Sequence, residues 1–113
     1  MSAVAYKILT AEQWSELDTT GRFEGAPVDL ADGYIHMSTA EQVRETADKH
    51  FAGQEQLVLA IVDLVALGDG VKWEPSRGEQ LFPHFYGVLP RAAVIDAAPL
   101  QLDADGKHVF PAL

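Results

Sequence analysis

The sequence predicts an α+β fold in a single compact domain, residues 1–113, with a mixed β-sheet of about six strands and two main helices. Helix signals are concentrated in the first half of the chain and strand patterns in the second half, which is typical of α+β proteins. The length suits one domain, and 48% hydrophobic with 22% charged residues is an ordinary globular composition.

The first half begins with a predicted strand over Val4–Leu9. The tetrapeptide Thr-Ala-Glu-Gln then occurs twice, at Thr10–Gln13 and Thr39–Gln42, and each copy has the spacing of a capping box. We therefore expect one helix from Thr10 to about Gly21 and a second from Thr39 to about Phe51, separated by a loop rich in glycine and proline.

The second half carries the strand patterns. The apolar run Leu57–Leu64 predicts a central strand buried on both faces, because it is short and rich in β-branched residues. Leu81–Leu89 contains Pro83 and is followed by Pro90, which predicts an edge strand or an irregular segment. Further short strands are expected at Val71–Glu74, Ala93–Ala97, Leu100–Leu102 and Lys107–Phe110.

The net charge of the chain limits the classes of partner that it can bind. Eight Lys and Arg against seventeen Asp and Glu give a net charge of −9, which disfavours binding to nucleic-acid backbones and to anionic membranes. The absence of cysteine excludes disulfides and thiolate chemistry. No apolar run has the length of a membrane span, and Met1–Thr10 lacks a signal-peptide pattern. We expect an acidic cytoplasmic protein that binds a small molecule.

Polar side chains share one face of the predicted strand Tyr34–Ser38, because alternate residues of a strand point the same way. Tyr34, His36 and Ser38 lie on that face, and Thr39 begins the second helix, whose free N–H groups favour an anion. The alternative is that Ser38 or Thr39 is only a helix cap and that His36 is structural.

Two later segments offer similar faces. Lys72 and Glu74 share one face of their strand, and His84 and Tyr86 share a face of theirs. If these faces meet, they form a cleft with imidazole, carboxylate and phenol groups. The alternatives are that Glu74 is a solvated carboxylate and that the aromatic residues are an edge cluster. No phosphate-binding glycine loop or nucleophile elbow is present. His36, His84 and Glu74 lack the spacing of metal-ligand pairs, so we predict no metal, and a metal held by these three residues is the alternative.

Three blocks of sequence carry a resemblance to a known family. They are Gly33–Thr39 (GYIHMST) followed by the Gln42–Phe51 helix, Lys72–Glu74 (KWE) and Phe82–Gly87 (FPHFYG). In this order they resemble the bacterial and plant family called domain of unknown function 952, from Tyr6 to about Leu102. That family has no established activity.

The family is in turn similar to the ADP-ribosyltransferase-like fold, and this resemblance implies nucleotide binding, with NAD as the candidate ligand. It implies that His36 holds the adenosine ribose with Ser38 close by, and that Trp73 or Tyr86 stacks on the nicotinamide. Such enzymes carry a late glutamate that stabilises the ribosyl cation. Here the chain has only aspartates after Glu79, so Glu74 is the nearest candidate.

In that enzyme, Thr39 and the helix start would contact the pyrophosphate together with Arg77 or Lys72. Glu74 would stabilise positive charge, and His84 would shuttle a proton. Three hypotheses stay open: a nucleotide pocket with transfer, hydrolysis or binding alone; a non-enzymatic module for a peptide or metabolite; and a metal-assisted hydrolase.

Overall fold

The computed structural model describes residues 4–113, apart from the side chain of Arg77. Nine strands lie in this part of the chain: β1 (Val4–Thr10), β2 (Arg22–Phe23), β3 (Ile35–His36), β4 (Leu57–Asp63), β5 (Val71–Pro75), β6 (Leu81–Phe85), β7 (Leu89–Pro90), β8 (Val94–Leu102) and β9 (His108–Val109). Its four α-helices are α1 (Ala11–Thr20), α2 (Pro27–Asp32), α3 (Val43–His50) and α4 (Leu64–Leu67), with short 3-10 turns at Gly68–Gly70, Arg77–Glu79 and Arg91–Ala93. None of the described helices is long and apolar enough to cross a membrane.

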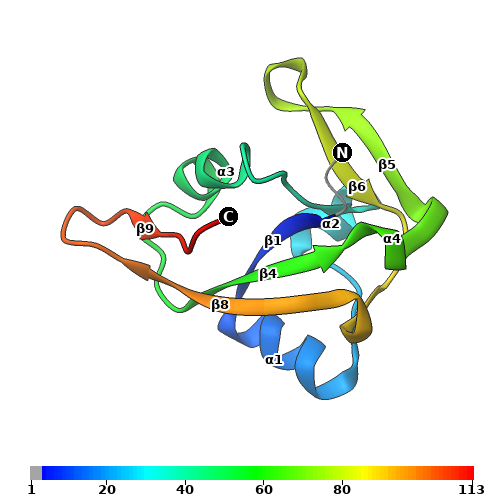
Figure 1. Ribbon diagram of the computed structural model, residues 1–113, viewed down its shortest axis with the longest axis horizontal. Coiled ribbons are helices and arrows are strands. Elements are labelled where there is room, and N and C mark those ends of the chain that lie inside the picture. Colours follow the sequence, from blue (N-terminus) through cyan, green and yellow to red (C-terminus); the bar gives the residue numbers. More distant parts are fainter. Residues whose placement is uncertain (1–3) are drawn as a thin grey trace.

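The main sheet has the order β1-β4-β8-β9, with the predicted strand β4 at its centre. Helix α1 packs against one face of this sheet and α3 against the other (Figure 1). Alternation along β1 supplies both faces, because Ala5 and Leu9 join the core under α1 whereas Tyr6 and Ile8 join the core under α3. The α+β class predicted from the sequence is therefore confirmed.

A second sheet, β3-β6-β5, meets the first where β3 ends. The amide of Tyr6 donates to the carbonyl of Ser38 at 2.7 Å, and the amide of Ser38 donates back to Tyr6 at 2.9 Å. One residue earlier, the amide of Met37 donates to the carbonyl of Pro83 in β6 at 3.1 Å. The segment after His36 thus joins the two sheets. Strands β2 and β7 form a small separate pair.

The first predicted helix is confirmed, including its capping box. Thr10 Oγ1 accepts from the amide of Gln13 at 3.1 Å, and Gln13 Oε1 accepts from the amide of Thr10 at 3.0 Å. The helix ends at Gly21, whose left-handed φ of 84° suits glycine.

The second capping box was predicted to begin a helix at Thr39, and this is wrong because α3 begins at Val43. The Gln42 side chain accepts from the Thr39 amide at 3.0 Å and donates to the Leu81 carbonyl at 2.8 Å. These bonds hold the four residues as a turn against β6. The Ser38 and Thr39 N–H groups, expected to face an anion, are therefore already paired within the protein.

The segment expected to be a loop contains helix α2, which the sequence analysis missed. Pro27 occupies its first turn, and Gly33 ends it with a left-handed φ of 88°. Asp29 Oδ2 accepts from the amide of Ala26 at 2.8 Å and so closes the N-terminus.

Three strand predictions are corrected. The pairings within the described residues are all antiparallel, so the sheet is not mixed. Strand β6 is the middle strand of its sheet and not an edge. The N–H that Pro83 lacks would point toward β3, at a position beyond the last residue of that strand, so the pairing of β6 with β5 is not interrupted. Ala93–Ala97 and Leu100–Leu102 are not separate strands but form the single strand β8, from Val94 to Leu102.

Candidate functional site

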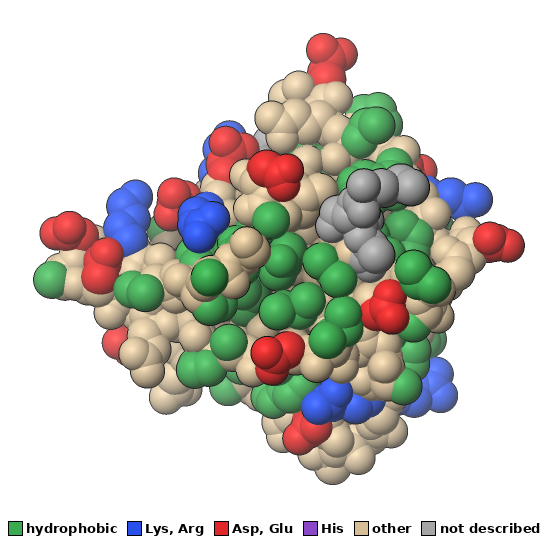
Figure 2. All heavy atoms as spheres, viewed as in Figure 1, with side chains coloured by type: hydrophobic (Ala, Val, Ile, Leu, Met, Phe, Trp, Pro, Cys, Tyr) green, Lys and Arg blue, Asp and Glu red, His purple; other side chains and the backbone are tan. Residues whose placement is uncertain are grey.

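A cavity of about 620 Å³ lies where α3, β1, β3, β6 and α2 meet. Its wall combines apolar and polar side chains: Tyr6, Lys7, Ile8, Gln13, Ala26, Pro27, Val28, Asp32, His36, Met37, Ser38, Thr46, His50, Phe51, Ser76, Phe82 and His84. Hydrophobic side chains gather at the centre of the face in Figure 2, with acidic and basic side chains around them. The volume lies in the range of small-molecule sites.

One side of the site is built on the β5–β6 hairpin around Glu74, which does not line the cavity itself but contacts His84, a residue of its wall. Antiparallel pairing sets Lys72 opposite His84 and Glu74 opposite Phe82, so these side chains project from one face. His84 Nδ1 donates to Glu74 Oε1 at 2.8 Å, and the Tyr86 hydroxyl donates to the same oxygen at 2.8 Å. The His84 side chain is only 3% exposed, whereas that of Glu74 is 37% exposed.

These hydrogen bonds control the ionisation of the groups. The bond from His84, and then that from Tyr86, hold the pKa of Glu74 below its ordinary value. The same bond to Glu74 raises the pKa of the Tyr86 phenol. Glu74 is therefore an ionised carboxylate with a fixed orientation, and His84 carries its hydrogen on Nδ1.

The other side of the site is built around Asp29 of α2, which is 1% exposed. Asp29 Oδ1 accepts from the amide of His36 at 3.0 Å and from its Nδ1 at 2.7 Å. Lys7 Nζ lies 3.0 Å from Asp29 Oδ2. Burial by itself would raise the pKa of Asp29, but the His36 hydrogen bond and the Lys7 charge lower it to about 2. Burial lowers the pKa of Lys7, while Asp29 acts to raise it.

Tyr34 connects the two sides. Its ring stacks on that of His84 at 4.2 Å between centroids and lies 4.6 Å from His36 and 5.2 Å from Tyr86. The two imidazole centroids are 5.4 Å apart. Burial, followed by the charges of Asp32 and Glu74, raises the pKa of the Tyr34 phenol.

The structure brings together four of the predicted site residues: His36, Glu74, His84 and Tyr86. Ser38 lines the same cavity, where its hydroxyl lies 2.9 Å from that of Thr46.

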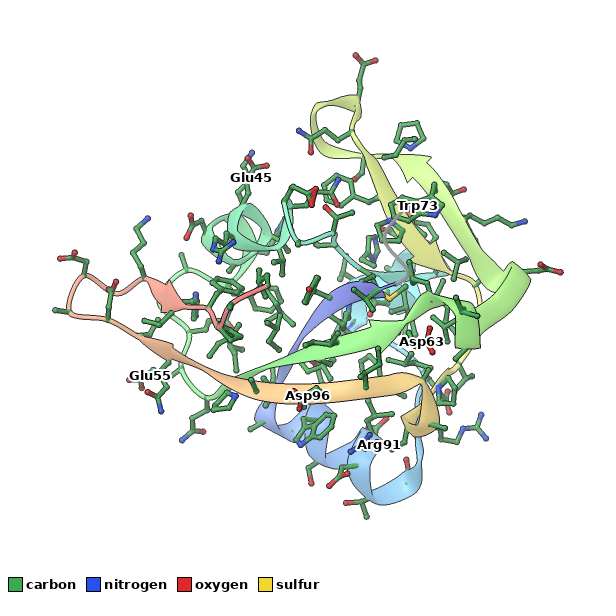
Figure 3. The ribbon with its side chains drawn as sticks, in the orientation of Figure 1. Glu45, Glu55, Asp63, Trp73, Arg91 and Asp96 are labelled. Atoms are coloured by element: carbon green, nitrogen blue, oxygen red, sulfur yellow. The ribbon has the colours of Figure 1, made fainter. Side chains whose placement is uncertain are left out.

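Three other predicted site residues do not join this group: two lie apart from it, and the side chain of the third is not among the described parts of the chain. Thr39 is not among the residues lining the cavity, and its amide is held by Gln42. Trp73 extends from β5 (Figure 3) on the face opposite Glu74 and is 44% exposed. The side chain of Arg77 lies outside the described part of the chain.

Sequence reasoning missed Lys7, Asp29 and Asp32 as members of the site. The signal for α2 was present, because Pro27 at a helix start and Gly33 just past a helix end form a typical pair. Lys7 carried no such signal, since a lysine in an alternating strand is normally solvated. Within residues 4–113, no three His, Asp or Glu side chains are arranged to hold a metal ion.

Comparison with known proteins gives the chain its family. The family model described as "Protein of unknown function (DUF952)" matches residues 8–97, which is most of the chain. The chain belongs to the DUF952 family. The match also confirms the resemblance predicted from the three sequence blocks.

Solved structures of a DUF952-like protein have the same fold. The crystal structure of protein CC0527 from Caulobacter crescentus is 50% identical with a TM-score of 0.89, over 94% of this chain and 93% of that one. The solution NMR structure of CC0527 is also 50% identical, with a TM-score of 0.84 over 94% and 91% of the two chains. No curated protein sequence matches the chain.

Proposed function

We propose that the cavity binds an N-riboside, a nucleoside or nucleotide of the NAD or ADP-ribose kind. Glu74 stabilises the positive charge that develops on the ribose when the N-glycosidic bond breaks. The observation that carries this proposal is the Glu74 carboxylate, held by His84 Nδ1 and the Tyr86 hydroxyl and still 37% exposed.

An ionised, oriented carboxylate suits electrostatic stabilisation of a cation, because it needs no reorganisation when the charge forms. The lowered pKa of Glu74 makes it a poor proton donor at neutral pH. The His84 side chain is buried and its Nδ1 hydrogen is committed to Glu74. We therefore assign His84 a positioning role in place of the proton-shuttle role predicted from the sequence.

The surroundings also suit a ribosyl ligand. Partly exposed Tyr34 and Tyr86 offer aromatic surfaces for a base or a sugar, while Asp32 and Glu74 offer acceptors for ribose hydroxyls. Because the Ser38 and Thr39 amides are paired within the protein, the ribosyl unit and not the pyrophosphate is the part of the ligand that we place here.

The fold supports the same reading. Two antiparallel sheets join at the Tyr6–Ser38 bridge, and His36 and Ser38 lie at the end of an early strand beside the cavity. We propose on this basis that the fold is ADP-ribosyltransferase-like, with Glu74 on β5 in place of a glutamate from a later strand.

The experiment combines binding and bond cleavage. ADP-ribose is titrated in a thermal-shift assay, because a ligand specific for the folded state raises its apparent stability. Nicotinamide release from NAD is followed by chromatography. Glu74→Gln is expected to bind ADP-ribose but to lose about 100-fold or more of the release rate. The matched control, Glu55→Gln, changes an exposed glutamate that is not part of the cavity lining and should behave as wild type.

A non-catalytic binding module is the second candidate. It is favoured by the apolar part of the wall, where Tyr6, Ile8, Phe51 and Phe82 provide surface without reactive groups. Binding of ADP-ribose with no base release by the wild-type protein would select this candidate. No stabilisation by any N-riboside, together with no release, would refute the proposal.

A further inference from the structure

His36 is held between two carboxylates. Its Nδ1 lies 2.7 Å from Asp29 Oδ1, and its Nε2 lies 3.0 Å from Asp32 Oδ2. Ionised carboxylates only accept hydrogen bonds. Both contacts are hydrogen bonds at the same time only if each ring nitrogen carries a hydrogen, which is the imidazolium form.

The two carboxylates differ in how firmly they are held. Asp29 is 1% exposed and is also fixed by Lys7 and by two backbone amides. The Asp32 side chain is 46% exposed and contacts His36 through Oδ2. A ligand entering the cavity can displace Asp32 but not Asp29, so the hydrogen on Nε2 is the one available to the ligand.

This hydrogen lies near the carboxylate that stabilises the ribosyl cation. The His36 and His84 ring centroids are 5.4 Å apart, and His84 holds Glu74 at 2.8 Å. Tyr34 contacts both imidazoles, and the charges of Asp32 and Glu74 both act on its phenol. His36 and Glu74 therefore both adjoin the stacked rings of Tyr34 and His84, where one ligand would contact both of them.

We infer, resting on the proposed function, that His36 is the general acid for departure of the nucleobase and that the substrate is an N-riboside whose base is uncharged, such as a purine nucleoside or nucleotide. A base of this class leaves poorly as an anion and needs a proton. The nicotinamide of NAD leaves as a neutral molecule and needs none. A positioned imidazolium is therefore useful for the first class of substrate and redundant for the second.

In the step, the bond between C1′ and the base nitrogen breaks, and its electron pair goes to the base. The Nε2 proton of His36 passes to the base, which leaves neutral. Water adds to C1′ and releases a proton to solvent, from which His36 Nε2 regains its proton. The products are the free base and the ribose or ribose phosphate, so atoms and charge balance.

The test compares two leaving groups in the same variants. Adenine release from AMP and nicotinamide release from NAD are measured for wild type, His36→Asn and Glu74→Gln. The asparagine amide retains a donor toward Asp29 but has no proton to transfer. We expect His36→Asn to lose about 100-fold or more with AMP, and to change little with NAD. Glu74→Gln should lose both reactions. His108→Asn, whose ring binds the Gln54 carbonyl away from the cavity, is the matched control.

The outcomes separate the inference from the proposed function. Equal losses of the two reactions in His36→Asn would mean that His36 only maintains the site, and would overturn the inference. Cleavage of NAD but not AMP by the wild-type protein would also overturn it while leaving the proposed function in place. Cleavage of neither would overturn the inference and the catalytic role of Glu74, and binding of ADP-ribose would then select the non-catalytic module. A melting temperature of His36→Asn near that of wild type excludes misfolding as the cause of any loss.

Discussion

The two histidine–carboxylate pairs of the site are built in opposite ways. In one pair the carboxylate is buried and the histidine faces the cavity, with side-chain exposures of 1% for Asp29 and 29% for His36. In the other pair the histidine is buried and the carboxylate is partly exposed, with side-chain exposures of 3% for His84 and 37% for Glu74. The contact distances are nearly equal, at 2.7 and 2.8 Å.

This difference decides which partner can act on a ligand. In each pair the buried member fixes the orientation and ionisation of the presented one, so the site offers an imidazole on one side and a carboxylate on the other. Only the buried carboxylate also neutralises a buried lysine, Lys7. We therefore expect the Asp29 side to contribute more to folding stability than the Glu74 side.

The largest effect is expected for Asp29→Asn. The substitution leaves the buried Lys7 ammonium without its counter-charge, and removing one partner of a buried pair typically costs about 3–5 kcal/mol. We expect the free energy of unfolding to fall by about 3 kcal/mol in urea denaturation followed by tryptophan fluorescence. The matched control is Asp32→Asn, which lies nearby but is exposed and should change stability by less than about 0.5 kcal/mol.

A double variant tests the cause of this loss. Adding Lys7→Met to Asp29→Asn removes the unpaired charge and should restore part of the stability. Similar losses in Asp29→Asn and Asp32→Asn would contradict the difference drawn between the two aspartates.

The next effect is a dependence of stability on acid pH. Asp29 has a pKa of about 2 in the folded protein against 3.8 as its ordinary value, so its ionised form favours folding. That stabilisation is complete above about pH 4 and is lost as the pH falls through about 2, amounting to about 2 kcal/mol. The measurement is urea denaturation of wild type and Asp29→Asn from pH 5 to pH 2.

The gap in the free energy of unfolding between wild type and Asp29→Asn reports on Asp29 alone, because the other carboxylates titrate in both proteins. We expect the gap to be widest above pH 4 and to narrow toward pH 2. A gap that stays constant over this range would show that Asp29 is not the group responsible.

Local sequence patterns correctly predicted the elements whose structure depends on neighbouring residues in the chain. The α1 capping box and the apolar run of β4 were found because local hydrogen bonding and alternation determine them. The second Thr-Ala-Glu-Gln keeps the bond from the Thr39 amide to Gln42 Oε1, but its Gln42 amide donates to the Thr39 carbonyl, whereas the Gln13 amide donates to the Thr10 hydroxyl. Identical tetrapeptides thus form a turn in one place and a helix start in the other, and in the turn Gln42 also donates to Leu81, a residue distant in sequence.

The candidate site was predicted in part for the same reason. Alternation placed Glu74, His84 and Tyr86 on faces that meet, since strand geometry is local. The role of Asp29 depends on the packing of a six-residue helix against β1 and β3, which no spacing in the sequence encodes. Asp29, the buried residue of this pair, could therefore not be predicted, whereas His36, its partly exposed partner, was predicted.

The smallest effects are expected on the Glu74 side, as changes in ionisation rather than in stability. The pKa of Glu74, measured by carbon-13 NMR of its carboxyl group, should lie below the ordinary value in wild type and rise in both His84→Phe and Tyr86→Phe. The rise should be larger for His84→Phe, because the hydrogen bond from His84 has the larger effect on Glu74, and phenylalanine keeps a ring against Tyr34. Tyr34→Phe is the control, since Tyr34 makes no hydrogen bond to Glu74 among those found in the described residues. Conversely, Glu74→Gln should return the raised pKa of Tyr86 toward its ordinary value in an ultraviolet titration. A larger rise in Tyr86→Phe than in His84→Phe would make the phenol the main anchor of Glu74. The buried histidine would then not be the counterpart of Asp29.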